Sequence, residues 1–247
     1  MGMAGRSVMI TATATATATI MNMIMITTTP TATTMTTDVD LLALTQWLSP
    51  SFPVGSYAYS QGLETAIADG DVTSEVDLQA WLATTLRTGT LFSDAVVLAA
   101  ALVSDADHDR LSMEALARAG SKTRRTEMLE QGRAFADAQA ALGEGPVPHH
   151  AFPVAVGRAA ARLSVPADRV VALYLQSLVS SLAIGAVRHI PLGQSAGQRI
   201  IAALSPDILR AANVALRTSL DDLALATPGA DLAAMRQETL EVRIFRS

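Results

Sequence analysis

Three polar side chains suited to molecular recognition follow a proline-rich stretch near position 50. Tyr57, Gln61 and Glu64 offer an aromatic ring, an amide and a carboxylate, which suit contacts with a partner better than core packing. They would share one face of a helix predicted to run from residue 57 towards residue 69, with Ser56 as its N-cap. An ordinary solvated helix face has the same periodicity, so the pattern alone leaves both interpretations open.

The residues around this predicted helix position it. Pro50, Pro53 and Gly55 have a structural role, because proline fixes φ and lacks an N–H donor, so the preceding helix must end here. That preceding helix is predicted to begin with Thr37 or Asp38 as its cap. The face of the 57–69 helix that is predicted to enter the core carries Tyr59, Leu63 and Ile67.

Other residue types that perform chemistry are sparse. The chain has no cysteine, which excludes disulfides and thiolate metal sites and fits a reducing, cytoplasmic location. No nucleophile–histidine–acid arrangement and no HExxH motif occurs, so we predict no enzyme, no catalytic residue, no bound metal and no cofactor. His149 and His150 follow a Gly/Pro-rich loop at 143–148 and could face a metal, but without nearby carboxylates a surface or packing role is favoured.

Composition indicates an all-α protein. Half of the 247 residues are hydrophobic but only 4% are aromatic, and alanine is abundant. These features predict a single bundle-like domain of about eight to ten helices at residues 38–247. Residues 1–37 are low in complexity, with Met35 a plausible start, and we expect a disordered extension; a signal peptide is the alternative. The net charge of −5 argues against nucleic acid as a partner.

Several further helices are predicted from periodicity and caps. Ser74 and Asp77 resemble a capping box that opens a helix ending near Gly89. An apolar stripe from 91 to 103 follows, broken only by Ser93 and Asp94. Helices are also predicted at 107–119, 121–142, 153–163 and 206–223. The 121–142 helix is rich in arginine and glutamate, and we expect a solvated surface with ion pairs between its turns.

The segment 168–189 has no charge between Val170 and Val187, which reaches the lower length limit of a membrane span. Its serines and glutamine would be costly against lipid, so a central, fully buried helix is favoured and no membrane is expected. Pro191 is then predicted to start a helix in which Gly193 and Gly197 share a face and permit close packing.

Three separated segments resemble one family, the UreF-type urease accessory proteins. Residues 48–64 read Leu-Ser-Pro-Ser-Phe-Pro-Val-Gly-Ser-Tyr-Ala-Tyr-Ser-Gln-Gly-Leu-Glu, and residues 186–199 read Ala-Val-Arg-His-Ile-Pro-Leu-Gly-Gln-Ser-Ala-Gly-Gln-Arg. Residues 235–247 read Met-Arg-Gln-Glu-Thr-Leu-Glu-Val-Arg-Ile-Phe-Arg-Ser, with Gln237 in place of a frequent histidine. Losing that histidine puts a metal-handling role for this segment in doubt, but not a docking role.

The resemblance implies an all-α accessory protein in urease maturation. Members bridge a UreD/UreH-like protein, a UreG-like GTPase and the urease apoprotein so that nickel reaches the urease active site, and they often form homodimers. On this basis Tyr57, Gln61 and Glu64 are predicted to form a docking surface. A docking tail is expected at about 229–247, where arginines surround an aromatic side chain, as in interface hot spots. Its partner-binding residues are Arg236, Glu238, Arg243, Phe245 and Arg246.

Two other functions stay open from the sequence. A tail arginine could act in trans on the nucleotide of a GTPase partner, as arginine fingers do. Alternatively, the protein could be a helical small-molecule receptor or enzyme with a cavity under the 168–189 helix.

Overall fold

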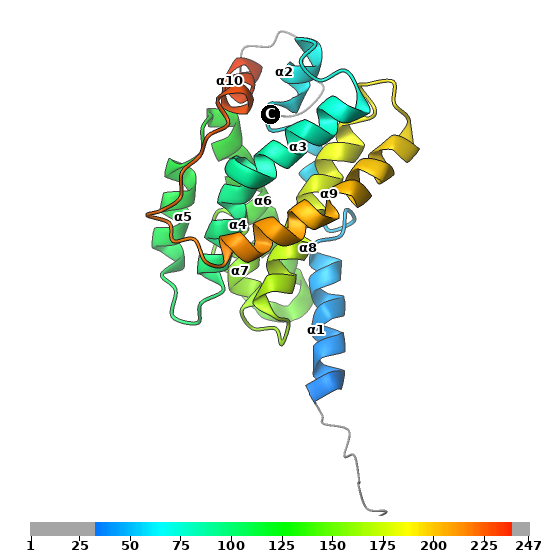
Figure 1. Ribbon diagram of the computed structural model, residues 1–247. Helices are drawn as coiled ribbons and strands as arrows, with labels where there is room; N and C mark the ends of the chain where they lie inside the picture. The colour runs from blue at the N-terminus through cyan, green and yellow to red at the C-terminus, as the bar shows by residue number, and fades with distance from the viewer. Residues whose placement is uncertain (1–32, 239–247) are drawn as a thin grey trace, which may run out of the picture. The chain divides into compact units, whose positions relative to one another are not determined.

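The computed structural model describes residues 33–238, and within that range every regular element is helical (Figure 1). The predicted all-α class is therefore confirmed. The α-helices are α1 (Thr33–Trp47), α2 (Leu63–Ala68), α3 (Glu75–Thr88), α4 (Thr90–Ala101), α5 (His108–Ala117), α6 (Lys122–Gln139), α7 (Phe152–Ala160), α8 (Ala167–Ala186), α9 (Gln194–Ala215) and α10 (Pro228–Gln237). Two short turns complete them, the 3-10 turn η1 (Ser56–Ala58) and the π-turn η2 (Ala140–Glu144).

Helix α8 forms the centre of the core. It packs against α9, α4 and α3, and Tyr174, Leu175 and Val179 have no solvent exposure. It is also long and apolar enough to cross a membrane, but 56% of its apolar window is buried inside the fold. The prediction of a central helix is confirmed, whereas "fully buried" was wrong, because Gln176 and Ser180 are partly exposed.

Helix α9 lies across α8 (Figure 1). A Cβ atom on Gly197 would lie 3.1 Å from Cδ1 of Ile184, so the predicted close packing at this glycine is confirmed. Gly193 instead forms the N-cap with φ 74°, and the prediction that Pro191 starts the helix was wrong. The predicted new start at Pro206 was also wrong, since α9 continues through it with Leu204 and Ile208 buried on either side.

Helix starts encoded by local sequence agree with prediction. The capping box of Ser74 and Asp77 opens α3, and α5 and α6 are separate helices as expected. By contrast, α1 begins at Thr33, so the predicted cap at Thr37 or Asp38 was wrong. Residues 1–32 lie outside the described residues, and the disordered extension stays a prediction.

The proline-rich segment after α1 is held by aromatic side chains. Pro50 and Pro53 lie in exposed turns, and Gly55 has φ 70°, which favours glycine. Phe52 enters the core between them, with its ring centroid 5.5 Å from that of Phe135. The Phe135 ring also contacts Trp47 at 6.1 Å, so the segment leaves α1 in a fixed direction.

The predicted helix over 57–69 was wrong. The chain forms η1 without a side-chain cap from Ser56, becomes extended at Tyr59, and turns through Gln61 and Gly62, both with positive φ, before α2 starts. A Cβ atom on Gly62 would lie 2.6 Å from the backbone nitrogen of Ala234 in α10. The close approach of α10 therefore sets the backbone here, and helical periodicity does not.

Candidate partner-docking site

A buried charged cluster joins α6 to α4. The guanidinium of Arg124, only 6% exposed, bonds Oδ2 of Asp94 through Nη2 and lies 2.8 Å from Oε2 of Glu127 through Nη1. The predicted solvated surface for this helix was wrong along one face, because Arg124, Glu127 and Gln131 all point inward. Arg125, the next residue, remains exposed.

Electrostatics keep Arg124 charged inside the fold. Burial opposes the charge of Arg124, but Asp94 and Glu127 outweigh it and raise the pKa of the guanidinium. Burial also raises the pKa of Glu127, and the attraction of Arg124 only partly offsets that effect. The Tyr174 hydroxyl donates to Oδ2 of Asp94 at 3.2 Å, and burial raises its pKa, so it remains a donor. One arginine thus holds two carboxylates inside the fold.

The same cluster holds the turn before α2. Gln61 Nε2 donates to Oε1 of Glu127 at 3.1 Å, while its Oε1 accepts from the hydroxyl of Thr90 at 3.1 Å. Beside it, the Tyr59 hydroxyl donates to Glu130. The positive φ of Gln61, 53°, is a strained conformation for a residue with a side chain, and these bonds stabilise it.

Gln237, at the end of α10, fixes the C-terminal segment to this turn. Its side chain has no solvent exposure. Nε2 donates to Ser60 Oγ at 2.7 Å and to Glu64 Oε2 at 3.2 Å, and Oε1 accepts from the Gly62 N–H at 3.0 Å. Up to residue 238 the C-terminal segment packs on its own domain, since α10 contacts α2 and α6.

The remaining predicted site residues lie around this contact. Tyr57 in η1 is 42% exposed, while Arg236 is exposed and lies 3.4 Å from Oδ2 of Asp69. Glu238 Oε1 accepts from the backbone N–H of Lys122 at 2.7 Å, at the first turn of α6. Gln61 and Glu64 point inward, so the structure does not bring Tyr57, Gln61 and Glu64 together as one solvent-facing surface. Arg243, Phe245 and Arg246 lie outside the described residues, and the partner-binding role of the whole set stays a prediction.

The adjacent histidines have separate surroundings. His149 is exposed and its Nε2 lies 3.2 Å from Asp137, whereas His150 is buried and its Nε2 lies 3.2 Å from Asp109. Burial lowers the pKa of His150, with Asp109 acting in the opposite direction. Within residues 33–238, no three His, Asp or Glu side chains are grouped to hold a metal ion. His149 therefore lies on the surface and His150 packs inside the fold, and each has an aspartate beside it that the sequence did not predict.

Sequence reasoning missed the cluster around Arg124. A signal was present, because Asp94 interrupts an apolar stripe, and Arg124, Glu127 and Gln131 recur at helical spacing. Each polar residue alone is more often solvated than buried. Nothing in the sequence indicates that the polar face of α6 meets Asp94 of α4.

Comparison with known proteins decides the family. The family model named UreF matches residues 72–205. A relative from Jannaschia sp. (strain CCS1), named "Urease accessory protein UreF", is 51% identical over 207 residues, covering 84% of this chain and 94% of the relative. This chain belongs to the UreF family. A UreF from Paracoccus denitrificans is 48% identical over 83% of this chain and 95% of its own length.

A third UreF, from Dinoroseobacter shibae, is 45% identical over 206 residues, covering 83% of this chain and 98% of the relative. The chain thus spans nearly the full length of these UreF proteins. Family membership confirms the resemblance seen in the three sequence segments.

Proposed function

We propose that this protein is a non-catalytic accessory protein of urease maturation. It scaffolds a complex of a UreD/UreH-like protein, a UreG-like GTPase and the urease apoprotein, in which nickel is inserted into the urease active site. The names of its relatives support the process. The observation that carries the scaffold role is the buried contact of Gln237 with residues 60–64, which fixes the first part of the proposed docking tail at about 229–247.

The contacts of α10 explain how such a tail would be presented. Gln237 is completely buried and Glu238 binds the first turn of α6, so residues 237 and 238 have a fixed position on the domain. A fixed starting point lowers the entropy that a partner must offset on binding. Arg243, Phe245 and Arg246 then contact the partner as arginine and aromatic hot spots do. Tyr57 contributes exposed aromatic surface from the adjoining segment.

Two described clefts against α8 offer little room for a small molecule. The cleft lined by Leu63, Ser181 and Ala186 leaves about 0 Å³ of space that a water molecule could occupy. The cleft lined by Trp47 and Ser177 has about 20 Å³, which fits about one water molecule. These clefts therefore give no support to a receptor that uses a cavity under this helix.

Co-purification with the three proposed partners tests the scaffold. We expect the full chain to capture the UreD/UreH-like protein and the GTPase, and a chain ending at Glu238 to lose most capture. The double variant Arg243→Ala/Arg246→Ala should behave like the shortened chain. Its matched control is Arg169→Ala/Arg217→Ala, which alters two exposed arginines of the helical domain. Unchanged capture of both accessory partners by the shortened chain would defeat the tail proposal.

A further inference from the structure

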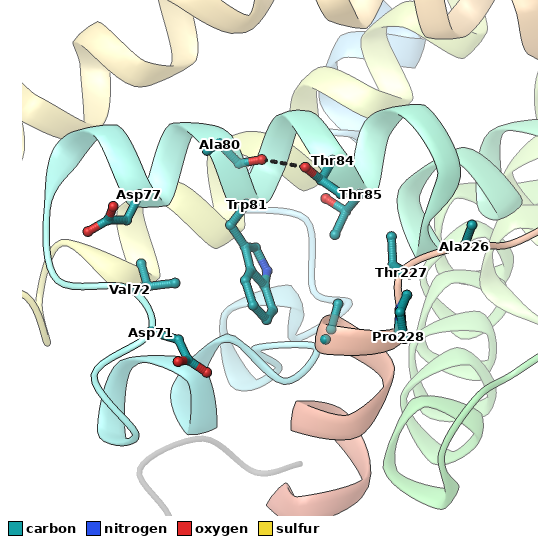
Figure 2. A pocket seen from close by; sticks show the side chains of 12 residues that line it. Asp71, Val72, Asp77, Ala80, Trp81, Thr84, Thr85, Ala226, Thr227 and Pro228 are labelled. Atoms are coloured by element: carbon teal, nitrogen blue, oxygen red, sulfur yellow. Dashed lines mark hydrogen bonds between the residues drawn. The ribbon is translucent and has the colours of Figure 1, made fainter.

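A cavity of about 380 Å³ lies between α3 and the start of α10, apart from the buried cluster. Figure 2 shows the indole of Trp81 projecting from α3 into this space, between Val72 on one side and Thr227 and Pro228 on the other. Trp81 is only partly buried and lines the cavity. The cavity is large enough for one long side chain, and its walls are mainly apolar.

Negative charge without an ion pair to any described residue lies at one end of the cavity. Asp71 and Asp77 line it, and neither makes an ion pair with a residue that the structure describes. Asp77 Oδ2 accepts from Ser74 and Thr73 of its own turn, and these bonds lower its pKa and keep it ionised. The neighbouring acids differ, since Asp69 is paired with Arg236 and Glu75 with Arg199.

We propose that this cavity binds an arginine side chain presented by a partner protein. The guanidinium would lie on the face of Trp81 and bond the carboxylate of Asp71, while its methylene groups contact Val72 and Pro228. Arginine combines an apolar stem, a planar cation that stacks on aromatic rings, and donors in a fixed fork. A wholly apolar side chain would leave the carboxylates unmatched, and an acidic one would be repelled.

We assign the arginine to a partner protein because a scaffold must present its binding sites to other chains. The cavity borders residues 226–230, at the first turn of α10, whereas residues 239–247 follow its last turn. A helix of this length separates its two ends by about 15 Å, a distance that nine residues can span, so a chain ending at Glu238 is the control for an arginine of the same chain. The inference rests on the proposed function for the existence of a partner protein, but binding at the cavity can be measured without that partner.

The test is a titration of the full chain with the peptide acetyl-Gly-Arg-Gly-amide, followed by tryptophan fluorescence. The chain has two tryptophans, so Trp81→Phe identifies the signal from the cavity. We expect saturable binding and a loss of affinity of about five- to tenfold in Asp71→Asn, which removes a charge-assisted bond at an exposed site. Asp105→Asn, an exposed aspartate outside the cavity, should bind like the parent. The citrulline peptide, which keeps the shape but lacks the charge, should bind at least about tenfold more weakly.

Three outcomes would overturn the proposal: no saturation, equal binding of the citrulline peptide, or no effect of Asp71→Asn. If a chain ending at Glu238 bound the peptide about tenfold more tightly than the full chain, its own tail would occupy the cavity and the assignment to a partner would be wrong. Peptide binding and complex capture are separate readouts. Loss of one with retention of the other therefore shows which of the two proposals fails.

Discussion

Gln237 Oε1 accepts a hydrogen bond from the backbone N–H of Gly62 at 3.0 Å, across 175 residues of sequence. This bond joins the end of α10 to a turn whose backbone is left-handed, with φ 86° at Gly62. Glycine is required there twice, by its conformation and by the backbone of α10 packed against it. The core of the protein therefore fixes Gln237, which lies within the proposed docking tail.

Gln237→Ala is expected to loosen α10 from the domain. The substitution leaves Gly62 N–H and Ser60 without their described bonds to this side chain, at a cost of about 1–3 kcal/mol in the free energy of unfolding. Urea unfolding measures the change, and capture of the accessory partners should fall with it. Gln198→Ala, at an exposed position of α9, is the matched control and should change stability by less than about 0.5 kcal/mol. Equal stability of the two variants would contradict the role given to Gln237.

Arg124→Met is expected to be severely destabilising. It removes the cation between the buried carboxylates of Asp94 and Glu127, and breaking a buried ion pair in this way costs about 3–5 kcal/mol. Chemical denaturation measures the loss. Arg125→Met, one residue further along α6 and exposed, should cost less than about 0.5 kcal/mol. A small effect at both positions would show that the cluster is unimportant for the fold.

The elements that sequence predicts correctly are those determined by local interactions. The Ser74–Asp77 capping box lies within four consecutive residues, and α3 starts there as expected. The kink at Gln61 and Gly62 depends on α10, and the inward face of α6 depends on Asp94 in α4. Those contacts join distant parts of the chain, so periodicity within one segment cannot reveal them.

Gly132→Ala is expected to disrupt the packing of α6 against the segment before α7. A Cβ atom there would lie 1.9 Å from the carbonyl oxygen of His150, a contact that the backbone must move to relieve. Overpacking of this kind costs about 1–3 kcal/mol or more, which a thermal melt would detect. Gly229→Ala is the control, because its new Cβ would meet no atom within 4 Å outside its chain neighbours and the backbone of its own helix. A melting temperature for Gly132→Ala equal to that of the parent would contradict the structure at this contact.

His150 should make stability depend on pH. Burial lowers its pKa in the folded state below the ordinary value of 6.5, so the unfolded chain binds more protons. The stabilisation that comes from keeping His150 neutral is complete above that value and is lost as the pH falls through the folded-state pKa. The urea midpoint of the parent should therefore be lower at about pH 5.5 than at about pH 7.5, and in His150→Gln this difference should be smaller than in the parent. His149→Gln, its exposed neighbour, should keep the parent's difference, and the same shrinkage in both variants would refute this assignment.

The nickel content of urease purified from cells tests the central claim most directly. Cells that carry the urease genes would express the full chain, a chain ending at Glu238, or neither. The scaffold account predicts nickel-loaded, active urease with the full chain, and largely nickel-free enzyme in the other two cases. Nickel-loaded urease that hydrolyses urea in cells without this protein would contradict it.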